Sequence, residues 1–174
     1  MNPVLEAIET RRSVRAYKSD MVPKELIDQV IHAGLCAASG MNFQDSIIVA
    51  VTDPELRAQL VEMNRAVIGP NAGPDPFYGA PVVLIVLVAA ERASIYDGSM
   101  VIGNMMLAAH ALDLGSCWVH RAQEEFASEE GKAILKKLGV EGEYVGVGHC
   151  ILGYIDGDYP AQIERKEGRV FYAE

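Results

Sequence analysis

The first residues able to do chemistry form a short basic segment near the N-terminus. Arg11, Arg12, Ser13 and Arg15 bring three cations and a hydroxyl together in a chain with only 15 Lys and Arg residues. Two guanidinium groups and a hydroxyl suit the oxygens of a terminal phosphate, because Arg favours planar, multidentate contacts. Basic side chains at a helix end also stabilise the helix dipole, by roughly 0.3 to 1 kcal/mol each. The residue types leave an anion site and a helix cap equally open.

Four other residues, Cys117, His120, His149 and Cys150, are of types that bind metals. Successive side chains of a strand point to opposite faces, so Cys117 is separated from His120, and His149 from Cys150. We therefore predict that they do not converge on a metal ion. The glycines nearby do not match the G-x-G-x-x-G motif of dinucleotide-binding folds.

The segment Asp97 to Arg121 is the element around which the chain is organised. Apolar residues such as Val101 and Met105 cover every face of its predicted helix, which Gly115 ends before a strand over Ser116 to His120. A helix of this kind must be buried on all sides. In a chain of 174 residues this predicts a subunit interface. A Met-rich helix packed inside a monomer fits the pattern nearly as well.

The remaining sequence alternates predicted helices and strands. We expect a helix over Pro3 to Arg12 with Val4, Leu5 and Ile8 facing inward. Other helices are predicted after Pro23, after Asp53-Pro54 and over Glu124 to Leu138 with a possible break at Gly131, and strands over Ser46 to Thr52, Val82 to Val88 and Val145 to Ile155. The pattern predicts one α+β domain with a mixed sheet of about four or five strands.

Two further features bear on a site. Residues Gly69 to Pro81 include three Gly and four Pro, which predicts an irregular, functional loop forming a mobile rim. Glycines in the strand over Val145 to Ile155 indicate the close approach of another backbone.

Composition excludes several classes of function. A net charge of -9 argues against a nucleic-acid partner. The longest apolar run, Ala80 to Ala90, is too short to span a bilayer, and the N-terminus lacks a leader pattern, so we expect a cytoplasmic protein without a membrane partner. The three cysteines are expected to be reduced and buried.

Four segments in this order resemble the nitroreductase family: RRSVRAY, ASGMNFQ, the DGSMVIGNMMLAAHALDLGSCW helix and the charged tail. The resemblance covers nearly the whole chain. It implies a nitroreductase-like mixed β-sheet flanked by helices, in an intertwined homodimer with FMN at the interface. It also implies NADH or NADPH as hydride donor and nitroaromatics, quinones or related small molecules as electron acceptors.

The family's flavin-binding residues carry over to several positions. Arg11, Arg12 and Ser13 match those at the phosphate and ribityl end of FMN, and Arg15 matches the residue near N1 and O2 of the ring. Ser39, Met41 and Asn42 match a loop that contacts flavin from the partner subunit. The family's Pro and Trp are missing from that loop, where Asp45 and Ser46 stand instead.

Two further matches complete the predicted site. Val119, His120 and Arg121 occupy the turn whose backbone N–H groups face flavin N5, and Arg121 stands where many members have Gly. In the tail, Arg165 and Lys166 resemble a basic pair that reaches the FMN phosphate, and residues 158–174 are expected to extend over the partner subunit. The single domain is expected to span residues 1–174.

No side chain is predicted to act as a catalytic acid or base, because the cofactor carries the chemistry. The predicted function is transfer of hydride from NAD(P)H through FMN to an acceptor. A related flavoenzyme with another reductive reaction, or a non-catalytic flavin carrier or sensor, remains an alternative.

Overall fold

The computed structural model describes residues 2–92 and 94–173. Four strands form one sheet in the order β1-β2-β4-β3, with bounds β1 Ser46–Val51, β2 Val82–Ala89, β3 Gly115–Val119 and β4 Tyr144–Gly153. The helices are α1 Pro3–Thr10, α2 Lys24–Leu35, α3 Pro54–Ile68, α4 Ile95–Ala111, α5 Ala122–Ala127 and α6 Glu129–Lys137, with short 3-10 turns at η1 Gly40–Asn42 and η2 Gly69–Asn71. These elements confirm the predicted α+β class.

The prediction of a mixed sheet is wrong, because all three strand pairings are antiparallel. Val51 at the end of β1 pairs with Val83 at the start of β2, so α3 and the 69–81 loop return the chain to the end of the sheet where β1 finishes. The only parallel pairing among the described residues is a single bridge between Ser13 and Ser116.

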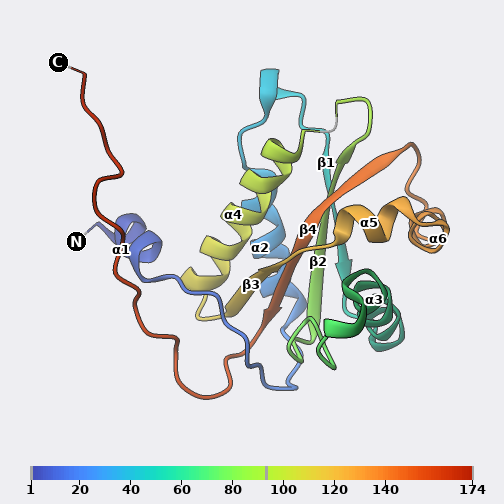
Figure 1. Cartoon of the computed structure of the whole chain (residues 1–174), viewed down its shortest axis with the longest axis horizontal. Helices are drawn as coiled ribbons and strands as arrows, with labels where there is room; N and C mark the ends of the chain where they lie inside the picture. The colour runs from blue at the N-terminus through green and yellow to red at the C-terminus, as the bar shows by residue number, and fades with distance from the viewer. Residues whose placement is uncertain (1, 93, 174) are drawn as a thin grey trace.

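The strand β2 divides the core into two layers because its side chains alternate in direction. Val82, Leu84 and Val86 pack with α2 and α4 on one face of the sheet. Val83 and Ile85 pack with α3, α5 and α6 on the other face. Figure 1 shows the sheet standing between these two groups of helices.

The predicted helix over Glu124 to Leu138 is two helices. The break lies at Ser128, whose Oγ accepts a hydrogen bond from the N–H of Gly131 and so caps α6. Gly131 lies inside α6, where an added Cβ would stand 2.2 Å from the carbonyl oxygen of Glu125. Because Gly131 has no side chain, α6 can pack closely against α5, and Gly131 does not mark the break between the two helices.

The predicted burial of α1 is wrong for the single chain, whereas the prediction that another subunit covers one face of α4 is not contradicted. Val4, Leu5 and Ile8 of α1 are each more than half exposed, because α4 is the main element against which α1 packs within the described residues. The helix α4 also keeps an open face, on which Met100 is half exposed. A helix enclosed inside a monomer, the alternative reading of its sequence, does not fit this arrangement.

The tail, residues 158–173, has no helix or strand, so the β-like sequence Arg169 to Tyr172 pairs with no strand of its own chain. Figure 1 shows the tail passing α1 and leading away from the sheet. Phe171 is 90% exposed.

The three cysteines are free thiols, but the prediction that all are buried is wrong for Cys36, which is exposed at the end of α2. Burial raises the pKa of the Cys150 thiol to about 12.

Candidate functional site

The basic segment lies along the outer edge of the sheet. The N–H of Val14 donates to the carbonyl of Ser116 at 3.0 Å, next to the bridge between Ser13 and Ser116. A second bridge joins Tyr17 to Ile155, and the Tyr17 hydroxyl donates to the carbonyl of Val14 at 2.8 Å. Because β3 is an edge strand, these contacts hold Arg11 to Arg15 beside the strand that leads to the Val119–Arg121 turn.

The three arginines of this segment have different partners. Nη1 of Arg12 donates to the carbonyls of Glu9 and Arg11 at 2.7 Å each, which is the helix-end contact expected of a cap. Nη1 of Arg11 and Nε of Arg12 are buried and have no hydrogen-bond partner among the described residues. The Arg15 guanidinium lies 5.9 Å from the centre of the Tyr78 ring. The helix cap is therefore present, and the unpartnered donors on two arginines leave the predicted anion site open.

The Val119–Arg121 turn has a backbone conformation that favours glycine. Arg121 has φ 88°, which for a residue with a Cβ costs roughly 1 to 2 kcal/mol. Its guanidinium pairs with Glu124 at 3.1 Å on the surface. The carbonyl of His120 accepts a hydrogen bond of 2.9 Å from Nδ2 of Asn64. The strained turn is therefore held by contacts from outside it.

A cavity of about 410 Å³ lies between this turn and the 69–81 loop. It is lined by Asn64, Ile68, Asn71, Gly73, Asp75, Pro76, Tyr78, Val119, His120 and Arg121. Arg57 fastens the loop, since it pairs with Asp75 and donates from Nε to the carbonyl of Ala80, both at 2.6 Å. The loop predicted to form an irregular, mobile rim forms one side of a pocket and begins with the 3-10 turn η2, and its mobility stays a prediction.

The Ser39–Gln44 loop is largely exposed and contains the 3-10 turn η1. Met41, Asn42 and Gln44 all have positive φ, and Oγ of Ser39 accepts from the N–H of Gln44 at 3.1 Å. The N–H of Gly40 donates to Asp97 near the start of α4, at 3.2 Å. Within the described residues, no hydrogen bond or ion pair joins Ser39, Met41 or Asn42 to the basic segment.

Behind this loop, Arg92 provides packing that the sequence did not reveal. Its guanidinium pairs with Asp45 at 2.7 Å and lies 3.8 Å from the centre of the Phe43 ring. The partner of Arg92 is thus Asp45, the residue that stands in place of the Pro of the family's usual signature.

The tail begins with a fixed contact and then leaves the site. The Tyr159 hydroxyl accepts from the N–H of Arg12 at 2.7 Å and lies 3.1 Å from Nδ1 of His110. Nε2 of His110 lies 2.8 Å from the Thr10 hydroxyl, which donates onward to the carbonyl of Glu6. Arg165 and Lys166 are exposed and have no hydrogen bond or ion pair with the described residues. The structure therefore does not bring them to the basic segment of their own chain.

Sequence reasoning missed the most buried polar group of the site. Glu125 and His149 pair at 2.9 Å with both side chains fully buried, and Asn64 donates to the same carboxylate. The available signal was a histidine inside an apolar strand, because a buried polar side chain requires a partner.

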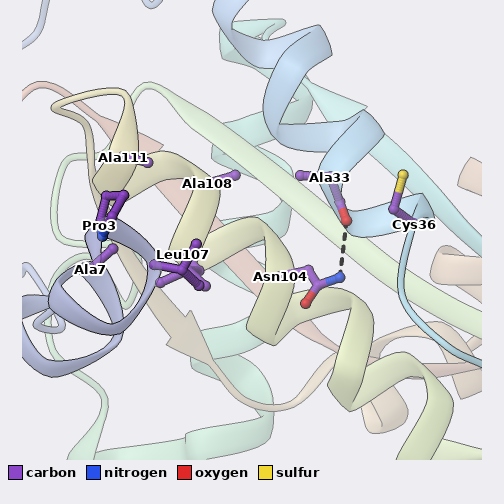
Figure 2. A pocket seen from close by; sticks show the side chains of 9 residues that line it. Pro3, Ala7, Ala33, Cys36, Asn104, Leu107, Ala108 and Ala111 are labelled. Atoms are coloured by element: carbon purple, nitrogen blue, oxygen red, sulfur yellow. Dashed lines mark hydrogen bonds between the residues drawn. The ribbon is translucent and has the colours of Figure 1, made fainter. Parts of the chain in front are cut away.

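A second cavity, of about 420 Å³, lies on the opposite side of α4 from the sheet and is almost entirely apolar. It is lined by Pro3, Val4, Ala7, Ala33, Cys36, Asn104, Leu107, Ala108 and Ala111, from α1, α2 and α4. Figure 2 shows Leu107 and Ala111 of α4 near Pro3 and Ala7 of α1, and the hydrogen bond of 3.1 Å from Asn104 to the carbonyl of Ala33.

The fold and the site define an α+β protein with a basic edge segment beside a pocket and an apolar groove along its central helix. Residues 8–154 match the sequence profile of the nitroreductase family. The chain belongs to this family. Among the described residues, no helix has the length and apolar character needed to cross a membrane.

Two relatives carry the name "Putative NADH dehydrogenase/NAD(P)H nitroreductase". The protein from Methanothermobacter thermautotrophicus is 34% identical over 125 residues, which cover 66% of this chain and 59% of that protein. The protein from Archaeoglobus fulgidus is 30% identical over 162 residues, covering 88% of this chain and 86% of the relative. A nitroreductase from Bacteroides fragilis, solved with bound FMN, has a TM-score of 0.88 and 29% identity, and each chain is covered completely.

Proposed function

We propose that this protein is an FMN-dependent oxidoreductase that takes hydride from NADH or NADPH and passes it to a small-molecule acceptor. One observation carries the proposal. Buried guanidinium donors of Arg11 and Arg12 have no partner among the described residues, and they lie on the segment that pairs with β3, the strand that leads to the turn at the pocket. The donors suit a phosphate, and the left-handed turn suits backbone contacts to a ring.

Different residues bind different parts of FMN. Arg11 and Ser13 bind the phosphate and ribityl end, while Arg12 fixes the end of α1 and offers its remaining donor. Arg15 serves the pocket end, where its cation favours negative charge on a bound ring. The Val119–Arg121 turn lines the pocket, and we assign its N–H groups as donors to the ring. When bound, FMN supplies the hydride chemistry, and the protein binds, orients and tunes it.

The site is completed by a second copy of the chain in a homodimer. The apolar groove beside α4 and the exposed apolar residues of α1 form one continuous surface that a partner subunit covers. The Ser39–Asn42 loop lies apart from the basic segment of its own chain, and it reaches the segment of the partner. The tail, residues 158–174, extends over the partner and brings Arg165 and Lys166 to the FMN phosphate there.

Steady-state turnover tests this function. The purified protein with FMN should oxidise NADH or NADPH in the presence of nitroaromatics or quinones, with the parallel double-reciprocal lines of a ping-pong mechanism. A protein that binds FMN tightly and turns over none of the acceptors with either nucleotide would instead be a flavin carrier or sensor.

A further inference from the structure

Three buried polar side chains from three different elements meet beneath the pocket. Asn64 lies on α3, Glu125 on α5 and His149 on β4, and none is more than 1% exposed. Oε1 of Glu125 accepts from Nδ2 of Asn64, and Oε2 lies 2.9 Å from Nε2 of His149. Within the described residues, the only ion pair of Glu125 is with His149. Such a group is stable only as a unit, because removing one partner leaves a buried charge or an unpaired polar atom.

The geometry determines how many protons the network holds. Nδ1 of His149 lies 3.2 Å from the carbonyl oxygen of Val119, and a carbonyl can only accept, so Nδ1 carries a hydrogen. The contact between Nε2 and Glu125 needs a second hydrogen, on the ring or on the carboxyl group. The pair therefore holds one proton more than a neutral imidazole beside a carboxylate, and it is neutral overall.

The network ends on the turn that lines the pocket. His149 donates to the carbonyl of Val119, and Asn64 donates to the carbonyl of His120 at 2.9 Å. These two carbonyls belong to the peptide groups whose N–H groups are those of His120 and Arg121. Hydrogen bonding to a carbonyl polarises its peptide group and strengthens the N–H as a donor. Neither N–H donates to a backbone carbonyl within the described part of the chain.

We propose that Asn64, Glu125 and His149 are positioning residues, which hold the Val119–Arg121 turn in its left-handed conformation and strengthen its N–H groups toward the ligand in the pocket. The effect on a bound flavin rests on the proposed function. The effect on the turn does not. Phe77 of the 69–81 loop packs against the His149 ring, with centroids 5.2 Å apart, so the same histidine supports both walls of the pocket.

Two variants distinguish the positioning of the Val119–Arg121 turn from the proton content of the network. Asn64→Leu removes the donor to the His120 carbonyl and releases the turn. Glu125→Gln keeps the arrangement, because its amide oxygen accepts from Asn64 and its NH₂ donates to Nε2 of His149, but it removes the extra proton. Glu124→Gln is the matched control, since Glu124 is the adjacent acid and its only ion pair among the described residues is with the Arg121 side chain at the surface.

Nuclear magnetic resonance of the full chain without flavin measures the protonation of the His149 ring and the amide signals of the turn. In the wild type, both ring nitrogens of His149 should carry or share a hydrogen. In Glu125→Gln, Nε2 should lose its hydrogen and the amide signals of His120 and Arg121 should move upfield. Asn64→Leu should move them further, and Glu124→Gln should leave them near their wild-type positions.

With FMN bound, Asn64→Leu should slow reduction by NADH about tenfold, with FMN affinity changed by less than about threefold. Glu125→Gln should slow reduction by NADH less than Asn64→Leu does. If Asn64→Leu does not fold, the amide signals of His120 and Arg121 in Glu125→Gln still test the proposal. Wild-type amide signals for His120 and Arg121 in Glu125→Gln, or an Nδ1 of wild-type His149 that carries no hydrogen, would overturn the proposal. If FMN does not bind while the signals shift as expected, the proposed function fails and the network stands.

Discussion

Gly146 of β4 is the position where one added methyl group should disturb the site most. An alanine Cβ there would lie 2.1 Å from the carbonyl oxygen of Ala122 and 2.3 Å from its carbonyl carbon. Ala122 begins α5 directly after the Val119–Arg121 turn, and β4 is paired on both sides. The helix must therefore move, by about 1 Å, to restore a normal contact distance.

The cost of this movement sets the size of the effect. Overpacking a filled site costs up to about 3 kcal/mol, and each kcal/mol lowers Tm by about 2–4 °C in a chain of this size. Gly146→Ala should lower Tm by roughly 6–12 °C in thermal unfolding followed by circular dichroism. It should also weaken FMN binding, because the displaced helix carries the turn with it.

The matched control is Gly73→Ala in the 69–81 loop, where an added Cβ meets no atom within 4 Å. Its Tm should be unchanged or slightly raised, since alanine restricts the unfolded chain. A Gly146→Ala protein with the wild-type Tm and FMN affinity would refute the packing of α5 against β4.

Three other perturbations test separate parts of the site. Arg11→Ala with Ser13→Ala should weaken FMN binding by about 1.5 to 3 kcal/mol per lost charge-assisted hydrogen bond, as measured by fluorescence titration, and an unchanged Kd would contradict their role. A chain ending at Gly157 should lose FMN as it dissociates on dilution, and sedimentation showing a dimer with full affinity would exclude the tail from assembly. Burial and then the charge of Arg11 lower the pKa of His110. The unfolded chain thus binds a proton at His110 more readily than the folded chain, so the stabilisation from His110 is present above about pH 6.5 and lost as pH falls through its folded pKa. In urea unfolding, His110→Gln should therefore reduce the change in the free energy of unfolding between pH 7 and pH 5. The same pH dependence in the variant and the wild type would contradict this.

Local patterns predicted most of the elements because local physics determines them. The alternation from aliphatic strand to Pro-started helix located β1, α3, β2 and β4 within a few residues. Glycine in β4 predicted a close backbone contact, which is confirmed at Gly146. The sheet direction was not predictable in the same way, because it depends on where α3 and the 69–81 loop end in space.

The site was predictable where a single segment carries it. The basic segment pairs with β3, the strand that leads to the Val119–Arg121 turn, and the flavin-binding role that the family resemblance implied for both stays a prediction. The burial of Val4, Leu5 and Ile8 failed because periodicity shows that a face is apolar and does not show whether its own chain covers it. The group of Asn64, Glu125 and His149 was missed because its members are far apart in sequence.

The identity of the bound cofactor tests the central claim most directly. The protein, purified without added flavin and then denatured, should release a yellow compound that chromatography identifies as FMN, in an amount near one per chain. Buried arginine donors without partners among the described residues suit a terminal phosphate, which FMN has and FAD lacks. A colourless protein that also takes up no added FMN would contradict the account.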